Sequence, residues 1–226
     1  MVMLKLSEAD HQRVSEAVAK AERESDGEIV TIIAPRSDAY HDVMLHYAVL
    51  AMLLVPVGFA VVPQGWIDSA AATFLGWGAE LSRPLAMTFL FAKMVAAFLL
   101  VRLLLAWMPL RMALTPPGTK TRRVRRRAVE LFRAGTERKT KGRTGVLLYL
   151  SLLERRAEIV ADEAIHSEVT PDAWGEAMAA LVDEVKAGRP GEGMARAVGK
   201  IGEVLAKCLP PNADNPNELP DRLIEL

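Results

Sequence analysis

Two long apolar runs in the middle of the chain determine its organisation. The first covers about residues 46–63, and the second covers about residues 85–108. Each is close to the roughly 20 residues that an α-helix needs to cross about 30 Å of hydrocarbon. Because unpaired backbone N–H and C=O groups are costly in lipid, a helix is the expected form for both runs. The pattern therefore predicts a transmembrane hairpin over residues 44–110.

Residues 1–43 precede the hairpin and predict one helix followed by one strand. Ser7 is a good N-cap, and apolar residues then recur with helical spacing to about Glu24. The segment 28–35 is short, rich in β-branched residues and almost wholly apolar, which is typical of a strand buried on both faces. Neither element can bury its apolar face alone, so we expect this part to fold with residues that follow the hairpin.

Residues 120–209 are predicted to supply the second part of the same domain. A basic helix comes first, and two apolar strands follow at about 145–153 and 157–162 as an antiparallel hairpin. Two amphipathic helices come next, the first starting at Thr170. This order predicts an α/β fold in which a small mixed sheet carries helices on both faces. Residues 210–226 form a C-terminal tail that either docks on the domain or frays.

Charge and cysteine content narrow the classes of function. The chain has 28 Lys and Arg residues against 28 Asp and Glu residues, which gives no overall reason to expect nucleic acid as a partner. The single cysteine, Cys208, excludes an internal disulfide framework and a cysteine-rich metal site.

Basic residues lie mainly on one side of the predicted hairpin. Arg83 is the one Lys or Arg between the apolar runs, whereas the sequence KTRRVRRR occupies 120–127, soon after the second run. Positive residues stay on the cytoplasmic side of a membrane. We therefore expect two spans, with both termini and the α/β domain in the cytoplasm.

The basic run at 120–127 is also a candidate membrane-surface site. Its arginines are Arg122, Arg123, Arg125, Arg126 and Arg127. Next to a membrane helix, such a run favours anionic lipid headgroups, at about 1 kcal/mol per charge near the surface. Nucleic acid is the alternative, but no aromatic residue interleaves with the run, which argues against single-strand binding.

Lys93 and Arg102 fall inside the second apolar run, where charged groups are costly. Arg102 is near the cytoplasmic end and can extend to the headgroups, and Lys93 is nearer the opposite surface and is expected to extend there. The alternative for Lys93 is a role in transport or in binding a partner helix, although the run contains no acidic residue to pair with it.

Asp162, Glu163 and His166 are the candidates for chemistry, because they follow the third predicted strand, where sites of α/β proteins tend to lie. Two carboxylates and an imidazole in one loop could hold a divalent metal ion, which would activate water. His166 could instead act as a general acid or base. The simpler interpretation is a polar loop whose acids accept hydrogen bonds from backbone N–H groups. Asp172 could add a ligand, or act only on a helix dipole.

The order of these elements is similar to that of the TPM domain family. The resemblance is carried by the strand TIIAP, the helix RAVELFRAG and the segment RTGVLLYLSLLERRAEIVADEAIHSEVTPDAW, over about residues 1–43 and 120–209. The family includes thylakoid lumen proteins assigned acid phosphatase activity and accessory proteins of membrane complexes. The resemblance implies a Rossmann-like α/β fold, a bacterial branch of the family and hence the bacterial inner membrane.

The chain departs from the family at the segments associated with metal or phosphate chemistry. Many members have Asp-Asn-Gly before the second strand, where this chain has Arg-Thr-Gly at 143–145, and Gly-x-Gly-Leu-Glu after the third, where it has Asp-Glu-Ala-Ile-His at 162–166. These departures favour an accessory or regulatory factor that binds membrane protein complexes. The alternatives are a metal-assisted phosphatase acting on phosphate esters and a homo-oligomeric membrane scaffold.

Overall fold

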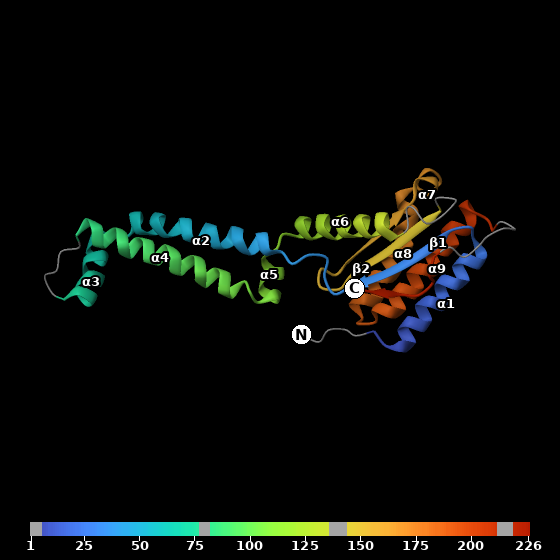
Figure 1. Ribbon diagram of the computed structural model, residues 1–226, viewed down its shortest axis with the longest axis horizontal. Helices are drawn as coiled ribbons and strands as arrows, with labels where there is room; N and C mark the ends of the chain where they lie inside the picture. Colours follow the sequence, from blue (N-terminus) through green and yellow to red (C-terminus); the bar gives the residue numbers. More distant parts are fainter. Residues whose placement is uncertain (1–5, 77–81, 136–143, 212–218) are drawn as a thin grey trace. The chain divides into compact units, whose positions relative to one another are not determined.

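The computed structural model describes residues 6–76, 82–135, 144–211 and 219–226. The chain divides into two compact units (Figure 1). The first unit is discontinuous and consists of Met1–Asp38 and Pro116–Leu226, and the second is the insertion Ala39–Thr115.

A mixed sheet forms the centre of the discontinuous unit. Within the described residues its strands have the order β3-β2-β1-β4, and they span β1 (Glu28–Ala34), β2 (Gly145–Ser151), β3 (Arg156–Ala161) and β4 (Ile224–Glu225). β1 pairs in parallel with β2 and with β4, whereas β2 and β3 pair antiparallel. The β1–β2 pairing joins the two parts of the domain across the insertion. The predicted α/β class with a mixed sheet is confirmed.

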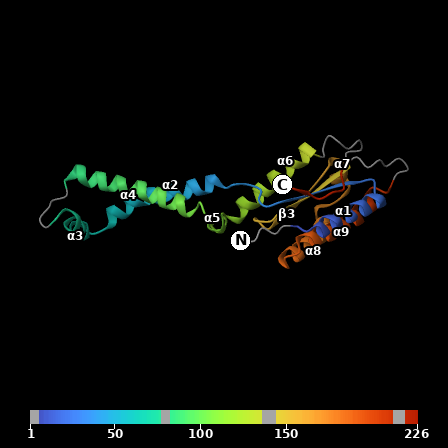
Figure 2. The same ribbon diagram turned by 60° about the horizontal axis from the view of Figure 1, so that its bottom comes forward.

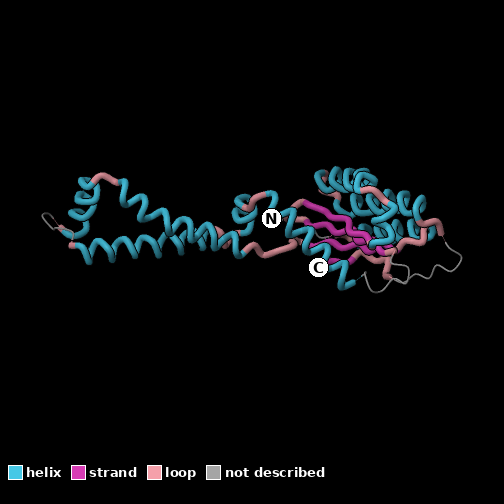
Figure 3. The backbone as a smooth tube through the Cα atoms, turned by 90° about the horizontal axis from the view of Figure 1, so that it is seen from above, coloured by secondary structure: helices cyan, strands magenta, loops and turns pink. Residues whose placement is uncertain are grey.

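Alternate side chains of the sheet face two separate cores. Every residue of β1 and β2 is buried, which explains why their sequences are almost wholly apolar. Ile29, Ile33 and Leu148 belong to the core on the side of α1 (Glu8–Glu24), α8 (Gly175–Lys186) and α9 (Pro190–Cys208). Val30 and Tyr149 belong to the core beneath α6 (Pro117–Gly135). Figures 2 and 3 show the strands between these two layers of helices.

The helices that cover the sheet follow their sequence signals. α1 begins with a capping box, in which Asp10 N–H donates to the Ser7 hydroxyl at 3.2 Å and Ser7 N–H donates to the Asp10 carboxylate at 3.1 Å. The helix expected from Thr170 starts as a 3₁₀ helix, η1 (Pro171–Trp174), and continues as α8. α1 and α9 pack closely at Gly202, where an added Cβ would lie 2.7 Å from the Ala21 Cβ.

The C-terminal tail docks on the sheet over residues 219–226. Leu219 and Leu223 are buried, and the short strand β4 lies beside β1. Leu219 N–H donates to a Glu28 carboxylate oxygen at 3.0 Å, and Leu226 N–H donates to the Ile33 carbonyl at 3.1 Å. The tail therefore supplies the fourth strand, which its sequence did not predict.

Glu22 is a buried carboxyl group near this tail. Its Oε1 accepts a hydrogen bond from Ile29 N–H at 2.8 Å. Burial raises the pKa of Glu22 to about 8 against the lowering effect of that hydrogen bond, and the carboxylates of Glu28 and Asp221 raise it further. Glu22 is therefore mostly protonated at neutral pH.

The insertion contains the two apolar helices as a hairpin. Its helices are α2 (His41–Val61), α3 (Gln64–Leu75), α4 (Arg83–Leu104) and α5 (Met108–Leu114), and α2 packs along α4 (Figure 1). α2 and α4 are long and apolar enough to cross a membrane, and only 17% and 0% of their apolar windows are buried. Phe91 and Leu103, for example, are 67% and 72% exposed. This exposure distinguishes the pair from core helices of a soluble protein.

Arg111 closes the base of the hairpin. It is buried, and its guanidinium donates to the carbonyls of Leu105 at 2.8 Å and Ala39 at 2.7 Å. It thus satisfies backbone acceptors at the end of α4 and ties them to the segment before α2. α4 ends at Leu104, earlier than the expected residue 108, and the separate helix α5 begins at Met108 with Pro109 in its first turn.

Candidate functional site

The segment after β3 is a short helix, so the prediction of a loop there is wrong. This helix, α7, spans Glu163–Glu168, and Asp162 occupies its N-cap position. Ile165 is fully buried in the core, and Val169 follows it four residues later, also buried. The burial of these two side chains stabilises the helix. Its six residues are mostly polar, and the segment is too short to show a helical pattern in the sequence.

Asp162 lies at the edge of the sheet where β1 and β2 begin. Because β3 runs antiparallel to β2, its last residues lie beside the first residue of β2. Asp162 N–H donates to the Gly145 carbonyl at 2.9 Å, and Gly145 N–H donates to the Asp162 carboxylate at 3.2 Å. The preference of ligands for the carboxyl ends of parallel strands therefore does not favour this edge.

The three candidate residues have different surroundings. Asp162 is 5% exposed and bonded to backbone, whereas Glu163 and His166 are exposed on α7. Among the described residues, no three His, Cys, Asp or Glu side chains are grouped so that they could hold a metal ion. Asp162, Glu163 and His166 are thus not arranged as the ligands of one divalent ion. Asp172 lies in the first turn of η1, and Arg143 lies outside the described residues.

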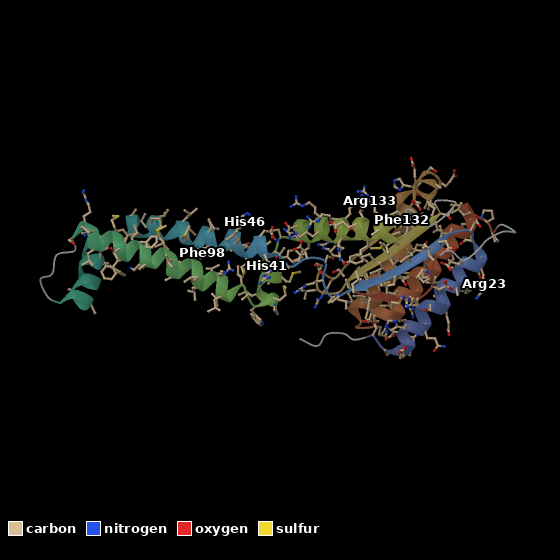
Figure 4. All side chains as sticks on the ribbon, viewed as in Figure 1. Arg23, His41, His46, Phe98, Phe132 and Arg133 are labelled. Atoms are coloured by element: carbon tan, nitrogen blue, oxygen red, sulfur yellow. The ribbon has the colours of Figure 1, made fainter. Side chains whose placement is uncertain are left out.

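A small cleft of about 230 Å³ adjoins Asp162 and Glu163. It lies between α6, β3 and α7, and Figure 4 labels Phe132 and Arg133 of α6. Its apolar lining comes from Val129, Phe132, Val160 and Ala161, and its charged lining comes from Arg133, Asp162 and Glu163. The charged side chains of Arg133 and Glu163 line this cleft and could contact a small charged ligand.

A polar cluster that the sequence did not predict lies at the opposite edge, where β1 and β2 end. The buried Glu154 carboxylate accepts hydrogen bonds from Ser37 N–H at 2.8 Å and from the Ser151 hydroxyl. The Ser37 and Tyr149 hydroxyls are 2.9 Å apart. Burial raises the pKa of Tyr149, so its phenol stays protonated at neutral pH. The signal in the sequence is a polar residue three positions after the end of each strand, Ser37 after β1 and Glu154 after β2.

The basic run lies on α6 and is partly engaged within its own domain. Arg123 and Arg126 donate to the two carboxylate oxygens of Asp38 at 2.8 and 3.1 Å. Arg127 lies 3.6 Å from the Glu130 carboxylate. Asp38 is the last residue before the insertion, and α6 begins at Pro117, two residues after the insertion ends at Thr115. The run therefore ties together the two segments at which the insertion leaves the domain and returns to it.

Comparisons with known proteins support the fold and the family. Residues 112–204 match the TPM domain model. The NMR structure of the BA42 protein from the psychrophilic bacterium Bizionia argentinensis is similar, with a TM-score of 0.57 and 17% identity, over 100% of this chain and 99% of that chain. At this identity the likeness concerns the fold. No curated protein matches the chain. Residues 112–204 are therefore identified as a TPM domain, and the resemblance expected from the sequence is confirmed.

Proposed function

We propose that this protein is a membrane-anchored accessory or regulatory factor, which binds a membrane protein complex at the cytoplasmic side of the bacterial inner membrane. The observation that carries the proposal is the exposed apolar surface of the α2–α4 hairpin, because none of the apolar window of α4 is buried. Soluble monomers rarely expose apolar patches of that extent. A surface of this kind needs lipid, or another apolar partner, to cover it.

The pairing of β1 with β2 supports the proposed topology. These strands flank the insertion in the sequence and are hydrogen-bonded to each other, so both ends of the insertion lie on one side of any membrane. The chain must then cross the membrane an even number of times, and two apolar helices satisfy this requirement. Only Arg83 is basic between the two apolar runs, which favours a cytoplasmic domain.

Anionic lipid headgroups are a further proposed partner, through α6. Arg123 and Arg126 pair with Asp38, so the lipid contribution is expected mainly from Arg122, Arg125 and Arg127, which are exposed and do not pair with Asp38. Each charge near an anionic surface is worth about 1 kcal/mol. The run would then bind lipid while it also holds the two ends of the insertion together. We propose no nucleic acid as a partner.

The topology gives the first prediction. A reporter that is active only in the periplasm is expected to be inactive when fused after Leu226 and active when inserted after Gly76, between the two apolar helices. Activity of each fusion, normalised to its amount, is the measurement. An active fusion after Leu226 would place the domain outside the cytoplasm and overturn the proposed orientation.

Hydrolysis of phosphate esters is the second candidate function, and the cleft beside α7 favours it. The Arg133 guanidinium can match phosphate geometry, and Glu163 supplies a carboxylate at the same cleft. We expect the accessory role to hold. Purified full-length protein in detergent should then show no turnover of a chromogenic phosphate ester above background, with or without added Mg²⁺.

Variants make that assay decisive. Turnover that is lost in Glu163→Gln or Arg133→Ala and kept in the control Glu168→Gln would establish the phosphatase. Asp162→Ala is a poor probe of chemistry, because it removes the acceptor of Gly145 N–H and is expected to cost about 1–3 kcal/mol of stability. Its melting temperature should be measured before any activity is compared.

A further inference from the structure

Lys93 lies at the middle of the exposed apolar helix α4. The helix spans Arg83–Leu104, so Lys93 comes ten residues after its start and eleven before its end, about 15 Å from either. The sequence placed it nearer one surface because the apolar run extends to residue 108. A lysine side chain covers only a fraction of 15 Å, so extension toward the headgroups does not remove its charge from a span centred on α4.

Among the described residues of α2 and α4, no acidic side chain lies at the same depth as Lys93. Lys93 is exposed on α4, and the apolar window of that helix is wholly unburied. Apart from Asp42 at the start of α2, neither α2 nor α4 contains Asp or Glu. A second copy of the hairpin would therefore bring only another Lys93 to this depth. Lipid headgroups, which lie at the surface, do not reach it either.

Small residues beside Lys93 leave room for another helix. Ala92 and Ala96 are both exposed, are one turn apart and lie on either side of Lys93 in the sequence. Small residues with this spacing allow close approach of helix backbones in membranes. The bulkier Phe89, 40% exposed, stands one turn before Lys93. This part of α4 therefore combines an unusual charge with an accessible backbone.

We propose that Lys93 is the docking point for a transmembrane helix of a partner protein, and that this helix carries Asp or Glu at mid-membrane depth. The inference rests on the proposed membrane span of α4. Ionisable residues within membrane spans are stabilised by pairing with one another, and a carboxylate is the group that complements an ammonium. Charge complementarity thus selects an acidic helix over an apolar one, with Ala92 and Ala96 as its backbone contact.

A designed peptide tests the pairing directly. Full-length protein labelled at its C-terminus is reconstituted in phosphatidylcholine vesicles with a labelled 22-residue Leu/Ala helix that carries one central Glu, and energy transfer is measured. We expect at least tenfold tighter association than for the same peptide with Leu at the centre. The preference should disappear in Lys93→Leu, persist in Lys93→Arg and persist in the control Arg102→Leu.

Two outcomes separate this inference from the proposed function. Flotation and alkaline extraction of the same vesicles report whether the protein spans the bilayer. A protein that is extracted at alkaline pH overturns the membrane span and the inference together. A protein that is inserted but binds both peptides equally, or that keeps its preference in Lys93→Leu, overturns the docking role of Lys93 alone.

Discussion

Excision of residues 39–115, with Asp38 joined to Pro116 by a short glycine–serine linker, is expected to move the protein from the membrane fraction to the soluble fraction without unfolding the α/β domain. The residues of both cores come from Met1–Asp38 and Pro116–Leu226. The linker can be short, because Asp38 is paired at 2.8 Å with Arg123, which lies about 9 Å along α6 from its start. The excision removes the whole exposed apolar surface of α2 and α4.

Ultracentrifugation and circular dichroism measure this outcome. The full chain with Arg123→Ala is the matched control. This variant loses the ion pair between Arg123 and Asp38 but keeps the hairpin, and it should stay in the membrane. An excised protein that remains membrane-bound after a high-salt wash would show that the hairpin is not the anchor. An excised protein that is soluble but unfolded would show that the insertion supplies stability to the domain.

Replacing Glu22 by glutamine is expected to make the domain more stable at neutral and alkaline pH. The pKa of Glu22 is about 8 in the folded state, above its ordinary value of 4.5, because burial disfavours its charge. The folded state therefore holds a proton that the unfolded chain releases. The stability from this proton is fully present below about pH 4.5 and is lost as the pH rises through about 8.

Glu22→Gln keeps the hydrogen bond from Ile29 N–H and removes that pH dependence. We expect the variant to match the natural protein near pH 4.5 and to exceed it by about 2–4 kcal/mol at pH 9, as measured by denaturant unfolding of the hairpin-free domain. Glu24→Gln, at an exposed position of the same helix, is the control and should leave the pH dependence unchanged. Equal slopes for all three proteins would contradict the assignment.

The sequence predicted those parts of the fold whose signals are local. The Ser7 capping box gives the start of α1, and the apolar runs that become β1 and β2 are buried on both faces, as expected. The antiparallel turn between β2 and β3 is also correct, with Glu154 buried and Arg155 at a φ of 51°. In each case a short stretch of chain is sufficient to fix its own conformation.

The rest depends on contacts between distant residues. β4 has only two residues, and their pairing with β1 follows from the burial of Leu219 and Leu223. No hydrophobic pattern in the sequence predicts this burial. The candidate site was predicted from the tendency of ligands to bind at the carboxyl ends of parallel strands, but β3 runs antiparallel to β2. Asp162 therefore lies at the edge where β1 and β2 begin. Ser37 and Glu154, which are 117 residues apart in the sequence, are hydrogen-bonded at the edge where β1 and β2 end.

The position of the insertion also sets the order in which the protein is made. Between the end of β1 at Ala34 and the start of β2 at Gly145, the ribosome must add 110 residues, which takes about 5–20 s. During this interval β1 has no neighbouring strand, and both apolar helices emerge. The domain can close only after the hairpin has been synthesised. Completion of the sheet is therefore a late event, and under the proposed topology it requires a hairpin that has returned to the side of the membrane from which it started.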